Sequence, residues 1–293
     1  MPTPKKSGFI TVFPDSARFF KDLRWPHGKK QCIRCADESI YTLKTGRLRC
    51  KSCGLTFGDF TRTYIGQLNV PINEIAHLLY LFSLGLPVYR CRHYITISLK
   101  TAHRAYTVFR KAIYDTLHKE FNDAMDAHPG IKDCMHSLFE MNFNKKWESE
   151  DHQVFFGIIV ISDTVFAFPI SAKEKSEVLK ITGILQRRPL LYNSDQGYCV
   201  ATLPVSDSHL IIQKMVNQKS GMKINPKIES FWTYLIEHLY HYHGISIPHY
   251  HLYVKEIEYR YKNRTKDIFH PLAKILVQPV ENKSKQPGLK ITK

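Results

Sequence analysis

Four of the seven cysteines in this chain lie within 22 residues, as two CxxC pairs. The pairs are Cys32 with Cys35 and Cys50 with Cys53, and 14 residues separate them. Each CxxC turn offers two thiolates, and two such turns together suit the tetrahedral coordination of zinc. Because sulfur fills all four positions, the ion has no open position for water. We therefore expect a structural zinc ion and not a catalytic one.

Three carboxylates form a second group of residues that could carry out chemistry. Glu140 lies in an otherwise apolar, strand-like run, where a charge is costly without a partner or a metal. Asp195 follows a short apolar run, and Glu229 falls in the first turn of a predicted helix that Asn225 can cap and Pro226 can begin. If they converge, they can hold two Mg²⁺ ions for phosphodiester chemistry. Three unrelated acidic residues are the alternative.

Three helical segments lie between the cysteines and Glu140, because the apolar spacing there takes the helical period. Short breaks between the segments are typical of a helix-turn-helix domain, which we place at residues 68–125. Ser98 is suited to cap the third segment, and the next two turns present Lys100, His103 and Arg104, where a recognition helix would meet DNA. Any small helical bundle gives a similar pattern.

Further segments are predicted before and after the three helical segments. Residues 17–63 form the cysteine module, with a hairpin predicted around Thr45-Gly46. The longest apolar run, Val154–Ile170, is broken by a Ser-Asp pair and is interpreted as two strands, not a membrane span. The expected order after residue 131 is α/β with one central sheet, with two helices at the end. It comprises strands at 136–143, 154–162, 164–170, 189–195 and 209–213 and a helix at 173–186.

Charge is concentrated at the two ends of the chain. The net charge is +16, with 13 Lys/Arg against 5 Asp/Glu in residues 1–64 and 10 against 4 in residues 255–293. This distribution suits a polyanion held at two places. A solubilising surface with a basic tail, residues 280–293, is the alternative. The N-terminus lacks the apolar core of a signal peptide, so we expect a cytosolic protein with reduced thiols and no membrane partner.

The order of these motifs resembles that of a bacterial insertion-sequence transposase with a zinc ribbon ahead of a DDE catalytic domain, the ISXO-two-like group, over residues 17–264. "RWPHGKKQCIRC" and "TGRLRCKSCGLTF" are similar to its ribbon, and "SLKTAHRAYTVFRKA" to its helix-turn-helix. "SDQGY" and "IESFW" resemble the segments with its second and third acidic residues. "EIEYRYKNR", with Glu256, Arg260 and Asn263, matches its closing helix.

The resemblance implies a ribonuclease H-like catalytic domain at residues 131–270, with Glu140, Asp195 and Glu229 as the acidic triad. Two Mg²⁺ or Mn²⁺ ions would serve strand cleavage and strand transfer. The implied partners are double-stranded DNA, both element ends and target, and further copies of the chain in a homodimer or higher oligomer. The implied location is the bacterial cytoplasm, at the nucleoid.

Basic and histidine-rich segments near the end of the chain have several interpretations. Arg260, Lys262 and Arg264 are expected to meet phosphates, the alternative being a solvated helix end. Histidines at positions 238, 241, 243, 249 and 251 allow a second metal site, but the family has no known metal role here. Contacts with the DNA backbone or simple packing are therefore favoured. Cys91, Cys134 and Cys199 stand alone and are expected as small buried residues.

Two departures from the family pattern leave a second function open. The family usually has Asp-Glu in the first strand, whereas this chain has Glu140-Met141. The extra methylene moves the carboxylate by about a bond length, and a displacement of about 1 Å can cost roughly a hundredfold in rate. The asparagine expected three positions before Glu229 is also replaced, by Pro226. The alternative function is that of a catalytically impaired or domesticated DNA-binding protein descended from a transposase. A zinc-ribbon transcription factor would leave the α/β part unexplained.

Overall fold

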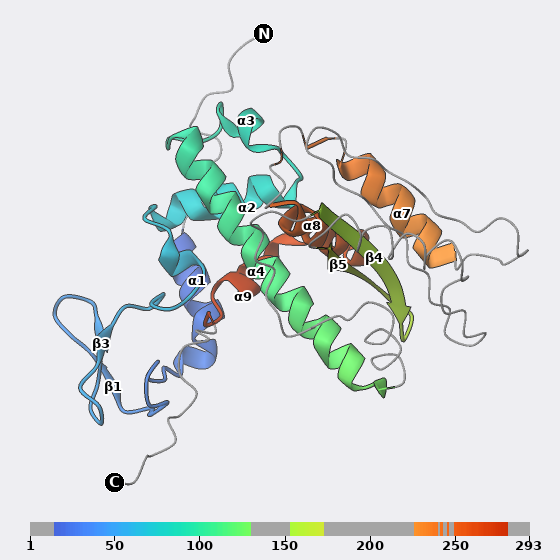
Figure 1. Ribbon diagram of the computed structural model, residues 1–293. Coiled ribbons are helices and arrows are strands. Elements are labelled where there is room, and N and C mark those ends of the chain that lie inside the picture. Colours follow the sequence, from blue (N-terminus) through green and yellow to red (C-terminus); the bar gives the residue numbers. More distant parts are fainter. Residues whose placement is uncertain are drawn as a thin grey trace, which may run out of the picture. The chain divides into compact units, whose positions relative to one another are not determined.

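The computed structural model describes residues 15–129, 153–172, 226–239, 241–242, 245 and 249–280 (Figure 1). The chain divides into two compact units, Met1–Ala112 with Asp267–Lys293, and Ile113–Lys266. We call them the ribbon unit and the hairpin unit. The boundary falls inside a long helix, α4 (Leu99–Asp126), so each part of that helix is described with its own unit.

The ribbon unit begins with a small antiparallel sheet. Its strands are β1 (Ile40–Thr42), β2 (Leu48–Cys50) and β3 (Thr56–Phe57), paired in that order. The predicted hairpin is confirmed: Gly46 takes a left-handed φ of +76° and donates its N–H to the carbonyl of Leu43 at 2.9 Å. The two-residue β3 was not predicted, because so short a strand shows no alternation of apolar and polar residues.

Helix α1 (Ser16–Arg24) joins the sheet to the helices of the same unit. Asp15 caps this helix, because its carboxylate accepts the N–H of Arg18 at 3.1 Å. Trp25 follows directly and reaches into the ribbon, where its indole N–H donates to Asp59 at 3.1 Å. The buried ribbon core consists of Trp25, Cys32, Leu48, Cys50 and Phe57.

The three helices predicted after the ribbon are present: α2 (Ile72–Ser83), α3 (Val88–Cys91) and α4. Ser98 caps α4 as predicted, since its hydroxyl accepts the N–H of Thr101 at 3.2 Å. The aromatic rings of α2 and α4 pack edge to face, with 4.9 Å between the ring centroids of Phe82 and Tyr106. Side-chain packing therefore holds α2 against the first half of α4.

A last helix, α9 (Phe269–Leu276), also belongs to the ribbon unit and was not predicted. It packs against α1 and α2, and the rings of Phe19 and Phe269 stack with 5.7 Å between their centroids. Figure 1 shows α9, in red, beside the blue α1. The chain then returns to the end of the ribbon, where the N–H of Val280 donates to the carbonyl of Arg62 at 2.7 Å.

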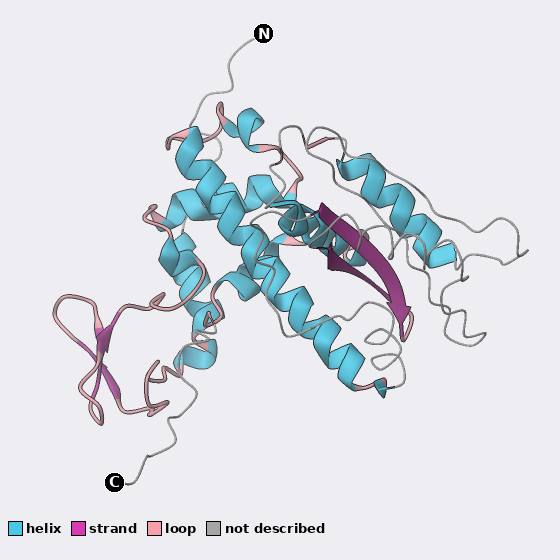
Figure 2. Ribbon diagram, viewed as in Figure 1, coloured by secondary structure: helices cyan, strands magenta, loops and turns pink. Residues whose placement is uncertain are grey.

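The hairpin unit contains two long strands, β4 (Gln153–Ile161) and β5 (Thr164–Ala172), which pair antiparallel (Figure 2). This confirms the two strands predicted from the apolar run. The connecting residues, Ser162 and Asp163, have φ of 45° and 67°. Positive φ at both central positions is what a type I′ hairpin turn requires, and this turn matches the twist of the strands.

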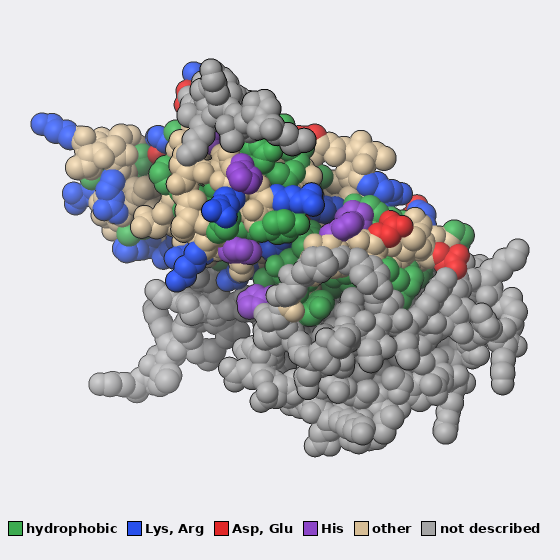
Figure 3. All heavy atoms as spheres, turned by 90° about the horizontal axis from the view of Figure 1, so that it is seen from above, with side chains coloured by type: hydrophobic (Ala, Val, Ile, Leu, Met, Phe, Trp, Pro, Cys, Tyr) green, Lys and Arg blue, Asp and Glu red, His purple; other side chains and the backbone are tan. Residues whose placement is uncertain are grey.

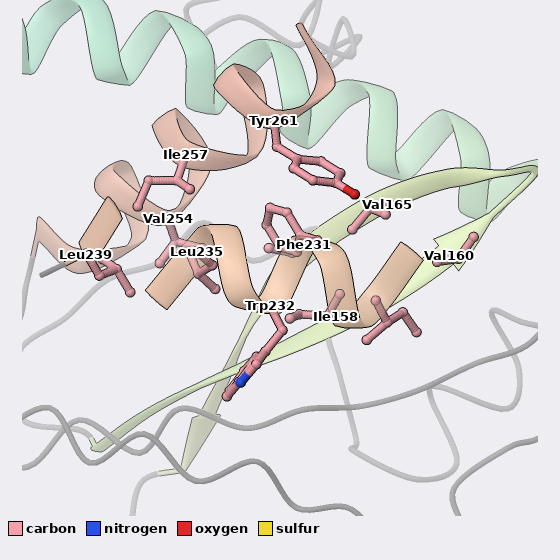
Figure 4. Packing of buried hydrophobic residues seen from close by; sticks show 12 residues of the cluster. Ile158, Val160, Val165, Phe231, Trp232, Leu235, Leu239, Val254, Ile257 and Tyr261 are labelled. Atoms are coloured by element: carbon pink, nitrogen blue, oxygen red, sulfur yellow. The ribbon is translucent and has the colours of Figure 1, made fainter. Parts of the chain in front are cut away.

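Helices cover both faces of this hairpin. On one face lie α7 (Pro226–Leu239) and α8 (Tyr250–Lys262), the two late helices that the sequence predicted (Figure 4). On the other face the ring of Phe121, in α4, lies 5.7 Å from that of Phe168. Strands covered on both sides have apolar residues in unbroken runs, which is the pattern found here. The first face buries Ile158, Val160, Val165, Ala167, Ile228, Phe231, Trp232, Leu235, Leu239, Val254, Ile257 and Tyr261.

Several predicted elements lie outside the described residues. They are the strands at 136–143, 189–195 and 209–213, the helix at 173–186 and nearly all of the tail at 280–293. Of the predicted single central sheet, the described residues include the β4–β5 hairpin, and the rest stays a prediction. Among the described residues, no helix is both long and apolar enough to cross a membrane.

Candidate zinc centre and acidic site

The four cysteines of the ribbon come together as the spacing predicts. Their sulfur atoms all lie within 4.8 Å of one another. The sulfurs of Cys32 and Cys53 are 3.5 Å apart, and those of Cys35 and Cys50 are 3.7 Å apart. Tetrahedral zinc with bonds of about 2.3 Å places its sulfur ligands about 3.8 Å from each other. The thiols are thus close to the positions that a zinc ion requires.

Both CxxC turns have the same backbone form. The carbonyl of Cys32 accepts the N–H of Ala36 at 2.9 Å, and that of Cys50 accepts the N–H of Gly54 at 3.1 Å. Ala36 and Gly54 each take a left-handed conformation, with φ of 59° and 70°. Each turn therefore folds back on itself and presents its two sulfurs on one side.

The electrostatics of the thiols also favour a bound cation. Burial opposes ionisation of Cys32, but the N–H groups of Cys35 and Arg34 outweigh it and lower the pKa of Cys32 to about 6. At Cys35 a hydrogen bond from the Asp37 backbone favours the thiolate, yet desolvation and the neighbouring thiols raise the pKa to about 12. One thiolate forms readily and further negative charge beside it is resisted. A divalent cation removes that resistance.

The zinc centre rests on the ribbon core on one side and lies near solvent on the other. Cys32 and Cys50 are buried with Trp25, whereas Cys35 is exposed. The guanidinium of Arg62 donates to the carbonyl of Ile33 at 2.9 Å and so ties the first turn to the chain that leaves the ribbon.

The lone cysteines are separate from this centre. Cys91, at the end of α3, is buried as predicted, with its sulfur 3.2 Å from the hydroxyl of Tyr106 in α4. Cys134 and Cys199 lie outside the described residues.

Of the three predicted carboxylates, the structure describes Glu229. Helix α7 begins at Pro226 as predicted, and Glu229 is exposed in its first turn. Ile228 and Trp232 are buried in the core of the hairpin unit, so they fix the rotation of the helix. The positive end of the helix dipole favours an anion at this position. Glu140, Asp195 and the predicted cap Asn225 lie outside the described residues, and the convergence of the three carboxylates stays a prediction.

Sequence reasoning did not find the buried ion pairs of α8. The carboxylate of Glu258 is fully buried, accepts the N–H of Ala167 in β5 at 3.1 Å, and pairs with Lys255 at 2.7 Å and Lys262 at 2.9 Å. It thereby fastens the edge of β5 to α8. The i, i+3 and i, i+4 spacing of these charges was a signal available in the sequence.

This pairing bears on the residues predicted to meet phosphates. Arg260 pairs with Glu256 at 2.7 Å and its side chain is 10% exposed, while that of Lys262 is 16% exposed. Arg264 is exposed, with its guanidinium 4.2 Å from the ring centroid of Tyr261. Of these three cations, Arg264 is the one whose charge faces solvent.

The basic residues predicted on α4 are all exposed. Lys100, His103 and Arg104 lie in its first two turns, whereas Ala102 and Ala105 between them are buried. The helix therefore packs with one side and presents its basic side to solvent. That is the placement the helix-turn-helix prediction requires.

Two histidines of the histidine-rich segment, His238 and His251, pack against aromatic rings. The ring of His238 stacks on Tyr234 with 3.8 Å between centroids, and that of His251 lies 5.1 Å from Tyr114. Over the described parts of the chain, the cysteine cluster is the group of three or more side chains placed to hold a metal. His243 lies outside those parts.

Two parts of the sequence match known protein-domain families. Residues 15–56 match a family described as the transposase zinc-ribbon domain, of the IS1595 type, and residues 139–262 match the ISXO2-like transposase domain. Both domains define a transposase. The chain belongs to the IS1595 family of insertion-sequence transposases. No curated protein and no solved structure matches it.

The matches confirm the resemblance found in the sequence. A zinc ribbon with four clustered cysteines takes a structural Zn²⁺ ion, and a transposase domain of the DDE type works with divalent metal. The second match contains all three predicted carboxylates, Glu140, Asp195 and Glu229. Neither match covers residues 68–125, which hold the predicted helix-turn-helix.

Proposed function

We propose that this transposase binds the terminal inverted repeats of an insertion sequence and catalyses cleavage and transfer of their strands. The observation that carries the proposal is the presence, in one chain and in this order, of the zinc-ribbon and DDE-type domain matches. Four sulfur ligands leave the ribbon zinc no position for a reactant. The chemistry therefore belongs to the second domain, for which we propose a ribonuclease H-like fold.

Glu140, Asp195 and Glu229 would hold two Mg²⁺ or Mn²⁺ ions. Carboxylate oxygens are the ligands that these hard cations prefer, and the exposed Glu229 in the first turn of α7 fits such a role. When bound, the two ions would stabilise charge on the attacking and leaving oxygens of a phosphodiester. The contribution of α7 is positional, because its buried side holds Glu229 at a fixed place.

Residues 68–125 would form the helix-turn-helix that reads the element ends, together with the ribbon at residues 17–63. Lys100, His103 and Arg104 are exposed on α4 and would meet the DNA there. Arg264 and the basic tail would add phosphate contacts, so binding should weaken steeply with salt. Two element ends must be joined, so we propose a homodimer or a higher oligomer on DNA.

A strand-transfer assay tests the catalytic assignment. The substrate is a duplex carrying the inverted repeat that flanks the gene, with Mg²⁺ or Mn²⁺. Asp195→Asn and Glu229→Gln should each reduce cleavage by about a hundredfold or more. Glu237→Gln, at another exposed acidic position of α7, is the matched control and should leave cleavage unchanged. Full activity of both site variants would refute the assignment.

The alternative, a catalytically impaired or domesticated DNA-binding descendant, is favoured by one observation: Glu140-Met141 stands where the family has Asp-Glu. The variant Glu140→Asp separates the two functions. Binding without cleavage by the natural chain, together with cleavage by Glu140→Asp, would establish the descendant. Cleavage by the natural chain would exclude it.

A further inference from the structure

The stretch from α2 into α4 has an unusual charge pattern. From Ile75 to Tyr114 the sequence contains no Asp or Glu. It does contain histidines and six Lys/Arg, namely Arg90, Arg92, Lys100, Arg104, Arg110 and Lys111. The part of it that precedes α4, residues 84–98, is here called the α3 segment. It adds two tyrosines to its basic residues.

The α3 segment is anchored to the ribbon unit by its own buried side chains. Val88, Cys91 and Ile95 are 4%, 0% and 6% exposed. The hydroxyl of Thr96 donates to the carboxylate of Glu74, in the first turn of α2, at 2.6 Å. Because both its middle and its end are fastened, the segment presents its remaining side chains in a fixed arrangement.

Those remaining side chains are aromatic and basic. Tyr89 is 58% exposed and Tyr94 38%, and with Leu84 they make up three of the four large hydrophobic residues that are exposed among the described residues. Arg90 and Arg92 are exposed between them, and the Arg90 guanidinium lies 5.7 Å from the ring centroid of Tyr89. Figure 3, which looks onto the α3 end of the molecule in Figure 1, shows basic, histidine and hydrophobic side chains side by side. Large apolar groups exposed together mark an interaction surface.

We infer that the α3 segment is a DNA-contacting surface, in which Arg90 and Arg92 bind phosphates and Tyr89 packs against a sugar or a base edge. Nucleic acid offers both partners at once, an anionic backbone and the flat apolar faces of sugar and base. A second copy of the chain fits less well, because a symmetric contact would bring the same arginines of both copies together. The inference rests on the proposed function and adds to it.

The position of the segment agrees with this role. The chain runs from it through the capping residue Ser98 directly into the exposed Lys100, His103 and Arg104 of α4. Of the α4 residues, Lys100 and Arg104 supply charge and hydrogen-bond donors, and neither carries a large apolar ring. Tyr89 therefore contributes something that phosphate contacts alone do not, a contact whose strength depends little on salt.

Titration of the full-length, zinc-loaded chain tests the inference. Fluorescence anisotropy would follow its binding to a labelled inverted-repeat duplex, and to a scrambled duplex of the same length, at several salt concentrations. Tyr89→Ala should weaken binding about tenfold and leave the salt dependence unchanged. Tyr89→Phe should keep most of the affinity, because it keeps the ring.

Arg92→Ala should act through charge, with a slope of log affinity against log salt that is smaller by about one. The control is Lys274→Ala, at an exposed position of α9 outside the segments proposed to meet DNA, and its loss should leave the slope unchanged. Near-ultraviolet circular dichroism of each variant would check that the fold is retained. Tyr89 and Arg92 are exposed, so little change is expected.

The possible failures are distinguishable. If the natural chain does not bind the inverted-repeat duplex, the proposed function fails, and the inference fails with it. If the natural chain binds, and Tyr89→Ala and Arg92→Ala bind equally well, the inference alone is overturned. It is also overturned if Tyr89→Ala dissociates a DNA-free oligomer in sedimentation and leaves DNA affinity unchanged, since the surface would then join copies of the chain.

Discussion

The ribbon and the hairpin unit are held together by different forces. The ribbon has a core of Trp25, Leu48, Phe57 and two cysteines, with its strands only two or three residues long. The hairpin unit buries β4, β5, α7 and α8 against one another and adds buried ion pairs. A chain segment as short as the ribbon cannot bury enough apolar surface to fold alone. The metal must supply what the core lacks, whereas the described part of the hairpin unit is held by apolar packing and ion pairs.

Zinc removal should produce the largest difference in stability between the ribbon and the hairpin unit. Zinc contributes about 10–16 kcal/mol to small structural sites of this kind, so a chelator or Cys50→Ser should unfold the ribbon completely. Two-dimensional NMR of the full chain should show loss of the ribbon signals and retention of those from β4 and β5. DNA affinity should fall as well.

Cys91→Ser is the matched control for that experiment, because Cys91 is buried in the same unit but lies outside the zinc centre. It should leave the zinc content at one ion per chain. Retention of ribbon structure and of full DNA affinity in the zinc-free protein would contradict the dependence of the ribbon on its metal.

Truncation of a side chain in the core of the hairpin unit should give the next largest loss of stability. This loss should be the same with and without a zinc chelator. Phe231 is fully buried and its ring lies 5.1 Å from that of Tyr261, edge to face (Figure 4). Phe231→Ala should lower the free energy of unfolding by about 4 kcal/mol, through lost burial and the cavity that remains. Urea unfolding with and without chelator would measure this. Ile236→Ala, at a partly buried position of the same helix, should cost clearly less.

The same contrast explains how much the sequence could predict. The zinc centre was predicted residue by residue, because ligand type and spacing are local and encode the geometry directly. The Ser98 cap and the start of α7 before Glu229 were predictable for the same reason. The role of Glu258 was not, since its partner Ala167 lies 91 positions away in the chain. The return of α9 to the ribbon unit likewise depends on packing that no local pattern encodes.

Loss of the buried charge at Glu258 should come third. Glu258→Gln removes the charge that compensates Lys255 and Lys262 and should cost about 3 kcal/mol, at the low end for a broken buried pair because Lys262 retains some exposure. The double variant Glu258→Gln with Lys255→Met removes one of the stranded charges and should recover part of the loss. A double variant less stable than the sum of its single variants would show that the pair is held by packing and not by charge.

The smallest effect should come from a single hydroxyl. Tyr242 donates to the carboxylate of Glu256 at 2.9 Å, and Arg260 binds the same carboxylate. Because the arginine remains after Tyr242→Phe, the charge stays compensated and the loss should be about 1.5 kcal/mol, the contribution of one hydrogen bond to a charged group. Tyr89→Phe, which removes an exposed hydroxyl, should change the free energy of unfolding by less than about 0.5 kcal/mol. A loss from Tyr242→Phe as large as that from Glu258→Gln would mean that Arg260 does not compensate Glu256 by itself. The hairpin unit would then depend on the Tyr242 hydrogen bond as strongly as on the buried charge of Glu258.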